Sequence, residues 1–388
     1  MGRQAFERVR ISWAGAVALG ALVMIVSSSA PLRGVAQVPG AQAASVDPLW
    51  PQPLPNHWIL GSVTGVDIDS RDHVWVVHQG AASLNRRTEN ALDTDPPGSE
   101  YCCASAPQVL EFDADGQLVG HWGGAGEGFD WPANPGGMAV DDEGNVWIAA
   151  AGLPPAPAGR GGRGGRGGAA QTTAPPVDGH ILKFSADGTF LMQIGHPGEA
   201  GGPDALGALL RPAAVDVDTR TNEVFVADTG HQRVAVFDAT TGAYKRQWGN
   251  AGTTPFQTLS CITLSRSGEV FVCDQEANTV FVFKTDGTPV REAIVSPGTR
   301  GAGSVWDIAL SADSDQKFAY VANGQEQTVH VLERATLSEV GRIGSGGRWP
   351  GYFFGVGSVA VNSMGQVITG EALQGKRVQR FLVNQAGR

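Results

Sequence analysis

Short apolar runs separated by polar turn segments recur along most of the chain. The pattern is clearest over residues 213–249, where the segments between the runs are rich in Asp, Asn, Thr and Gly. These residue types favour tight turns, and short apolar runs of this kind are typical of β-strands. Residues 213–249 therefore predict a four-stranded antiparallel meander, with strands over 215–217, 224–227, 234–237 and 244–248.

The same pattern occurs six times. The last three intervals between equivalent first-strand positions are close to the length of one propeller blade, and the first two are longer because each contains an insertion. The sequence therefore predicts an all-β fold, a six-bladed β-propeller of four-stranded antiparallel blades. The equivalent first-strand positions are Gly65, Gly137, Ala214, Cys261, Asp307 and Ser358.

The sixth repeat lacks a fourth strand, because the chain ends soon after its third run at 377–381. Residues 57–61, which read His-Trp-Ile-Leu-Gly, are similar to the fourth strands of the other repeats. We therefore expect the ring to be closed by an N-terminal strand at 57–61. Closure of this kind removes an open sheet edge, which would otherwise promote aggregation.

The N-terminus has the pattern of an export signal. Arg3, Arg8 and Arg10 precede an apolar run at 11–26, which is short for a membrane span. Residues 1–44 are interpreted as a signal peptide, or alternatively an uncleaved anchor, with a short mature tail. Residues 45–388 then form a single propeller outside the cytoplasm, periplasmic or secreted.

The formal net charge of −10 disfavours nucleic acids and anionic membranes as partners, because both bind basic surfaces. The insertion at 151–179 contains Arg-Gly-Gly repeats that resemble nucleic-acid-binding tails, but its Gly- and Pro-rich composition indicates a disordered linker. We expect a monomer with a protein, peptide or small-molecule ligand, and no membrane contact beyond an N-terminal anchor.

Four cysteines form two candidate pairs. Cys261 and Cys273 lie on the first and second strands of the fourth repeat, where they could form a disulfide or remain as two buried thiols. Cys102 and Cys103 are adjacent in a loop, and a vicinal disulfide, two free thiols and intermolecular pairing are all open. Disulfides are compatible with an oxidising compartment outside the cytoplasm.

Both insertions, 79–106 in blade one and 151–179 in blade two, follow second strands and emerge on the face where every first strand begins. We call this the insertion-bearing face. Propellers commonly bind ligands there. Arginine suits a carboxylate and tryptophan suits stacking, although such residues could also form a solvated rim. The candidate ligand-binding residues are His78, Gln79, Arg211, Gln275, Trp306 and Asp307.

Asp67 and Asp216 occupy equivalent central positions of first strands, where four other repeats carry Ala or Thr. Two inward carboxylates could form an acid/base pair or ligate a metal. Alternatively, each accepts hydrogen bonds that hold neighbouring blades together, as buried carboxylates require. Asp67, Asp216 and His78 are the catalytic candidates.

The segment 218–228, followed by Arg-Val-Ala-Val-Phe at 233–237, resembles NHL repeats, and this resemblance extends over about 57–383. Within that superfamily the chain looks most like the peptidyl-α-hydroxyglycine α-amidating lyases. The similar segments are 76–80, 135–141 and 262–287. The resemblance implies a zinc ion held by three histidines, with arginines and a tyrosine nearby.

Those histidines fall on Gly136, Ser260 and Gly357, and two arginines fall on Gln79 and Gln275. The segment that carries the tyrosine is shortened here and has none. The resemblance therefore implies that the zinc site is not retained, although it leaves a structural calcium near Asp307 open. We expect an exported binding scaffold. The alternative is a divergent carbon–nitrogen lyase or hydrolase, metal-dependent or not, that uses Asp67, Asp216, Arg211 or His78.

Overall fold

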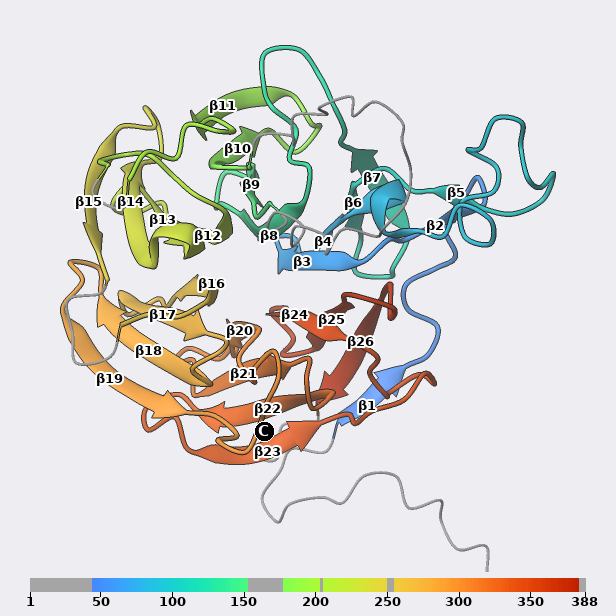
Figure 1. Ribbon diagram of the computed structural model, residues 1–388. Coiled ribbons are helices and arrows are strands. Elements are labelled where there is room, and N and C mark those ends of the chain that lie inside the picture. Colours follow the sequence, from blue (N-terminus) through green and yellow to red (C-terminus); the bar gives the residue numbers. More distant parts are fainter. Residues whose placement is uncertain (1–43, 153–176, 203–204, 250–254, 384–388) are drawn as a thin grey trace, which may run out of the picture. The chain divides into compact units, whose positions relative to one another are not determined.

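The computed structural model describes residues 44–152, 177–202, 205–249 and 255–383. Six four-stranded antiparallel sheets surround a common axis, as predicted (Figure 1). Blade one contains β3 Val63–Ile68, β4 Val74–His78, β6 Val109–Phe112 and β7 Leu118–Trp122. Blade two contains β8 Pro135–Val140, β9 Val146–Ala150, β10 His180–Phe184 and β11 Phe190–Gly195. Blade three contains β12 Pro212–Asp218, β13 Glu223–Asp228, β14 Arg233–Asp238 and β15 Tyr244–Trp248.

The other three blades follow the same order, with the innermost strand first. Blade four contains β16 Leu259–Leu264, β17 Glu269–Asp274, β18 Thr279–Lys284 and β19 Pro289–Ile294. Blade five contains β20 Asp307–Leu310, β21 Phe318–Asn323, β22 Thr328–Glu333 and β23 Glu339–Ile343. Blade six contains β24 Val356–Val361, β25 Val367–Glu371, β26 Arg377–Val383 and β1 Ala44–Asp47. Only two short 3₁₀ helices occur in the described ranges, η1 Gly80–Ser83 and η2 Thr229–His231.

Burial along each strand follows from its position in the blade. Every residue of the second strand β13 is buried, whereas exposed and half-buried residues alternate along the start of the outer strand β15. A second strand has a strand on each side and a neighbouring blade over each face, so it reads as a continuous apolar run. The outer strand has one open edge and carries charged side chains, which blunt that edge.

The core is divided into six clusters, one between each pair of adjacent blades. Between blades three and four, for example, Phe225 and Val236 pack with Val270 and Phe281. Each sheet therefore buries both faces, which stabilises the ring through the removal of apolar surface from water. No blade has a core of its own.

The ring is closed by an N-terminal strand, but that strand is β1, and the prediction of 57–61 was wrong. β1 pairs with β26 in blade six, and Asp47 forms an ion pair with Arg380 at 2.7 Å. β2 (Trp58–Ile59) instead pairs in parallel with β5 (Ala104–Ser105), at the base of the blade-one insertion. The insertion supplies a backbone partner for the predicted segment, and β1 is left to cover the edge of β26 (Figure 1).

The blade-two insertion contributes only 151–152 and 177–179 to the described ranges, so the disorder expected there lies outside them. The N-terminal segment interpreted as an export signal also lies outside them, except for Ala44, which begins β1. No helix in the part of the chain that the structure describes is long and apolar enough to cross a membrane. Two disulfides are present, Cys102–Cys103 in the blade-one insertion and Cys261–Cys273 between β16 and β17.

Candidate functional site

The first strands of all six blades line a cavity on the axis of the propeller, with a volume of about 460 Å³. Ser260, Trp306 and Gly357 line it near the insertion-bearing face. Seven aspartates also line it. Four of them, Asp69, Asp72, Asp141 and Asp142, belong to turns between first and second strands, on the face opposite the insertion-bearing one. The other three carboxylates lie on the first strands of the alternate blades one, three and five: Asp67, Asp216 and Asp307. The axial cavity is therefore acidic.

Each of the three carboxylates joins two blades. One oxygen accepts the N–H of the next residue in its own strand, at 2.7–2.9 Å. The other oxygen accepts an N–H from the first strand of the following blade, also at 2.7–2.9 Å. This arrangement agrees with the interpretation in which the carboxylates hold blades together. The pairs across blades are Asp67 with Val140, Asp216 with Leu264, and Asp307 with Val359.

Asp307 lies nearer the insertion-bearing face than the other two carboxylates. Asp67 and Asp216 are opposite Trp75 and Phe225, the equivalent positions of their second strands. In blade five Ala309 occupies the equivalent position of the first strand, and Asp307 precedes it by two residues. A two-residue offset keeps a strand side chain on the same face of its sheet, so Asp307 still points to the following blade.

Burial raises the pKa of all three carboxyls. The pKa of Asp67 rises to about 6, and the pKa values of Asp216 and Asp307 rise to about 7. Their backbone hydrogen bonds oppose this rise, and the negative charge of Asp67 adds to it for the other two. The axial carboxyls can therefore exchange protons near neutral pH, which suits acid/base chemistry or the binding of a cationic group.

The walls of the cavity supply little positive charge. Arg266 is the one basic side chain among the described residues that line it. Its guanidinium donates to the backbone carbonyls of Ala312 and Asp313, at 3.1 and 3.0 Å. The negative charge of the carboxylates is therefore offset by backbone N–H groups and is reduced by protonation of the carboxylates themselves.

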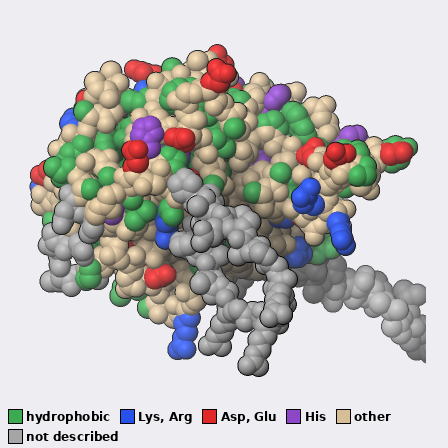
Figure 2. All heavy atoms as spheres, turned by 45° about the horizontal axis from the view of Figure 1, so that its top comes forward, with side chains coloured by type: hydrophobic (Ala, Val, Ile, Leu, Met, Phe, Trp, Pro, Cys, Tyr) green, Lys and Arg blue, Asp and Glu red, His purple; other side chains and the backbone are tan. Residues whose placement is uncertain are grey.

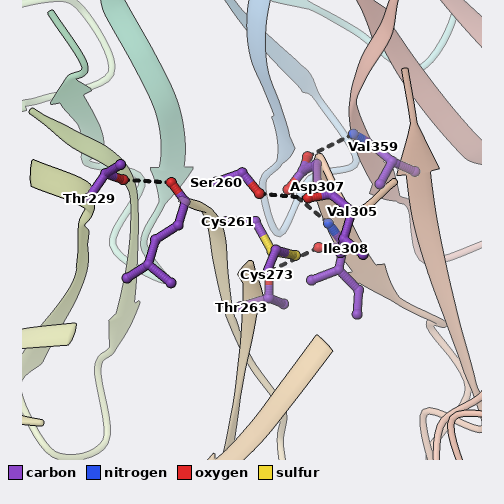
Figure 3. The surroundings of a disulfide bond; sticks show 10 residues. Thr229, Ser260, Cys261, Thr263, Cys273, Val305, Asp307, Ile308 and Val359 are labelled. Carbon is purple, nitrogen blue, oxygen red and sulfur yellow. Dashed lines mark hydrogen bonds between the residues drawn. A yellow bond between two sulfur atoms is a disulfide. The ribbon is translucent and has the colours of Figure 1, made fainter. Parts of the chain in front are cut away.

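A wall of the cavity also contains the hydroxyl groups of Ser260 and Thr263, neither of which was among the ligand-binding candidates. In blade four, Ser260 donates to the carbonyl of Val305 at 2.7 Å, and Thr263 donates to the carbonyl of Ile308 at 2.9 Å (Figure 3). The Cys261–Cys273 disulfide lies between them (Figure 3). Thr263 occupies the same repeat position as Asp216. A polar residue at that position was therefore the sequence feature that could have identified Thr263 as part of the cavity wall.

His78 does not line the axial cavity. It is fully buried, and its Nδ1 accepts the N–H groups of Gly61 and Gly80, both at 3.0 Å. Its Nε2 donates to the carbonyl of Pro107 at 2.8 Å. Burial lowers the pKa of His78 to about 4, so the imidazole is neutral. Both ring nitrogens are engaged in holding the blade-one insertion to β4.

Gln79, Arg211 and Gln275 also lie outside the residues that line the axial cavity. The amide of Gln79 donates to Asn134, beside a second cavity of about 500 Å³ next to the blade-one insertion. Arg211 has a left-handed backbone with φ of 52°, and its buried Nε has no hydrogen-bond partner among the residues that the structure describes. The backbone of Gln275 bonds to Thr258 at 2.8 Å. The structure therefore brings Trp306 and Asp307 together with Asp67 and Asp216, and keeps the other four ligand-binding candidates apart.

The residues at the three zinc-histidine positions do not fit a zinc ion. A Cβ on Gly136 would lie 2.7 Å from the carbonyl oxygen of Ala213, which is backbone and cannot easily move. The hydroxyl of Ser260 is already bonded to Val305. A Cβ on Gly357 would lie 3.2 Å from the Cβ of Ala372. Zinc in proteins is bound by Cys, His, Asp or Glu side chains, and none is present at these positions.

The axial carboxylates are also not preassembled as a metal centre. Within the described ranges, one group of three metal-ligating side chains has all its ligand atoms within 4.8 Å of one another, and it lies elsewhere in blade one. Calcium takes six to eight oxygen ligands, so an ion beside Asp307 would need backbone oxygens or water as well. Calcium at the axis stays a prediction.

Comparisons with known proteins agree with the fold. Residues 209–237, which include β12 and β13, match the family model of the NHL repeat. A structural genomics protein of unknown function from Bacteroides thetaiotaomicron superposes with a TM-score of 0.52 and 14% identity, over 88% of this chain and 76% of its own. At such identity the likeness shows the fold alone. No curated protein sequence matches the chain.

Two further solved structures resemble this chain more loosely. A streptogramin B lyase has a TM-score of 0.49 and 10% identity, over 88% of this chain and 98% of its own. The WD40 β-propeller domain of Doa1 has a TM-score of 0.46 and 10% identity, over 82% and 78%. The fold and the matched repeat together define the class: this protein is a six-bladed β-propeller that carries an NHL repeat.

Proposed function

We propose that the protein is an exported binding scaffold, which takes a protein, peptide or small-molecule ligand on its insertion-bearing face. The observation that carries this proposal is the axial cavity, which Trp306 and the three first-strand carboxylates line, and where the one basic side chain among the described lining residues, Arg266, donates to backbone carbonyls. Trp306 donates its indole N–H to the carbonyl of Gly303 at 2.9 Å, which fixes the ring at the mouth. A ligand with an amine or guanidinium group fits this lining best, because carboxylates and an aromatic ring both attract cations.

The surface is compatible with such a partner. On the face that Figure 2 shows, acidic, basic and hydrophobic side chains are interspersed, and Lys and Arg do not gather into a stripe. Nucleic-acid binding depends on a basic patch or stripe. This supports a protein, peptide or small ligand over a nucleic acid.

Thermal unfolding with a panel of probes tests the proposal. The probes are arginine amide, lysine amide, short peptides with a free N-terminus, and acetate as an anionic control. We expect the cationic probes to raise the unfolding midpoint of the wild-type propeller, since a ligand that binds the native state stabilises it. Trp306→Ala and Asp307→Asn should remove the shift. Equal shifts in these variants, or none in the wild type, would overturn the axial site.

A second candidate function is a divergent lyase or hydrolase. The observation that favours it is the pKa of about 7 at Asp216 and Asp307, since a general acid or base works best when its pKa is near the operating pH. Turnover of a peptidyl-α-hydroxyglycine would support the finer resemblance to amidating lyases. Such turnover should fall at least about 100-fold in Asp216→Asn or Asp307→Asn. If these variants fold and keep their rate, the axial carboxyls are not catalytic.

A further inference from the structure

Asp69, His73 and Glu111 form a cluster of metal-ligating side chains on blade one; Asp69 also lines the axial cavity, whereas His73 and Glu111 do not. Asp69 and His73 belong to the turn between β3 and β4, on the face opposite the insertion-bearing one, and Glu111 lies on β6. One ligand atom from each residue lies within 4.8 Å of the other two.

The two carboxylates are held in place from several directions. One oxygen of Asp69 accepts the N–H groups of Arg71 and His73, at 2.9 and 3.0 Å, and the other accepts the indole N–H of Trp75 at 3.3 Å. Asp69 and Glu111 are each 8% exposed. These contacts fix the ligand atoms before any ion arrives, which lowers the entropic cost of binding one.

One carboxylate oxygen of Glu111 accepts no hydrogen bond from the described residues. Both contacts of Glu111, from Arg71 and His73 at 2.7 Å, are made to Oε1, and no described residue donates to Oε2. Oε2 lies over Gly120, where a Cβ would approach it to 2.6 Å. Glycine at that position of β7 therefore makes room for a nearly buried carboxylate with an unused acceptor.

A cation already lies at the centre of the cluster. Nη2 of Arg71 is 2.5 Å from Asp69 Oδ2 and 2.7 Å from Glu111 Oε1, which shows that one positive group can reach both carboxylates at once. The side chain of Arg71 is 56% exposed. It can turn into water without burying its charge, and this distinguishes it from a buried ion pair.

We propose that Asp69, His73 and Glu111 bind a divalent transition metal, with Arg71 as the counter-ion that the metal displaces. One imidazole nitrogen and two carboxylate oxygens suit zinc and its neighbours better than magnesium or calcium, which prefer oxygen alone. When the divalent ion replaces the guanidinium of Arg71, the positive charge beside the two carboxylates rises from one to two. Because Arg71 competes for the same oxygens, its removal strengthens metal binding.

Isothermal titration of the chelator-treated propeller with zinc chloride tests this. We expect one equivalent to bind the wild type, at least about tenfold more tightly to Arg71→Met, and at least about tenfold more weakly to His73→Ala and Glu111→Gln. His121→Ala, which changes a histidine outside the cluster, should bind as the wild type does. Magnesium should not compete.

Two results would overturn the proposal. One is the absence of single-equivalent binding to the wild type. The other is binding that His73→Ala leaves unchanged or that Arg71→Met does not strengthen. Since the side chain of His73 is 22% exposed, His73→Ala is expected to fold, and circular dichroism checks this for each variant. If Glu111→Gln fails to fold, the comparison of His73→Ala with Arg71→Met still decides the outcome.

Discussion

The axial carboxylates and His78 are buried polar groups that are bonded to backbone groups. The axial carboxylates each accept two N–H groups, and the imidazole of His78 accepts two and donates one. A buried polar group without such partners would destabilise the fold by about 1–3 kcal/mol. Their ionisation is therefore part of the folding equilibrium, and pH changes reveal it.

The loss in free energy of unfolding caused by Asp216→Asn is expected to become smaller as pH rises. The pKa of Asp216 is about 7 in the fold against an ordinary value of 3.8, so its stabilising effect is complete below pH 3.8 and is lost as pH rises through 7. Asparagine does not ionise. Urea unfolding at pH 5 and pH 8 should show the free energy of unfolding of the variant gaining about 2 kcal/mol relative to the wild type. A constant difference between the two proteins would contradict the raised pKa.

The comparison of two proteins is needed because other groups titrate in the opposite direction. Burial lowers the pKa values of His78, His180 and His330 below the usual 6.5. A histidine that is kept neutral stabilises the fold above its unfolded pKa, and that contribution is lost as pH falls through the folded pKa. The wild-type profile alone therefore mixes opposing contributions, whereas the difference between variant and wild type isolates Asp216.

His78→Ala should lower the free energy of unfolding by about 3 kcal/mol or more at pH 7, because it removes three hydrogen bonds and leaves a cavity. Chemical denaturation measures this. His121→Ala is the matched control: His121 is exposed and its ring packs edge-to-face with Trp58, so its loss should be small. A small effect for His78→Ala as well would show that the blade-one insertion is held by other contacts.

How far single residues could be predicted depended on where their partners lie. Asp67 and Asp216 stood out because a carboxylate interrupts an apolar strand at the same repeat position, and both line the cavity. His78 was expected at a ligand-binding rim. Its burial depends on Pro107, which the insertion returns to the end of β4, and no local pattern shows that return.

At the scale of elements, the strands of the repeats followed the pattern of apolar runs closely. The outer strand of blade four, β19 at Pro289–Ile294, is exposed or half-buried along its length. The closing strand was misassigned because β1 has only four residues and only Val46 among them packs as a large apolar side chain. Residues 57–61 have the stronger pattern, and their partner is a segment of the insertion.

The two disulfides should differ in their effect on stability. Cys261 and Cys273 are separated by 12 positions and join two strands, whereas Cys102 and Cys103 are adjacent and close no loop of chain. Loop closure in the unfolded state accounts for about 3 kcal/mol at a separation of this size. Guanidinium unfolding should therefore show a loss near that value for Cys261→Ala with Cys273→Ala. Cys102→Ala with Cys103→Ala should lose much less, and equal losses would refute the loop-closure argument.

At the scale of the whole ring, stability is shared among interfaces. The six apolar clusters each join two blades, so a blade that loses one neighbour exposes half of its core. The axial carboxylates add ties between blades one and two, three and four, and five and six. The join between the two ends of the chain lies within blade six, where β1 completes the sheet.

Removal of β1 should therefore weaken the ring as a unit. A chain that lacks residues 1–47 loses the four paired residues of β1 and the ion pair of Asp47 with Arg380, and it bares the edge of β26. We expect its unfolding midpoint to fall by about 5 °C or more, with aggregation that increases with protein concentration. The matched control lacks only residues 1–43 and keeps β1, so it should behave as the full propeller does. Scanning calorimetry and light scattering compare the two, and if both are equally stable and soluble, β26 needs no partner and the ring is held by its apolar interfaces alone.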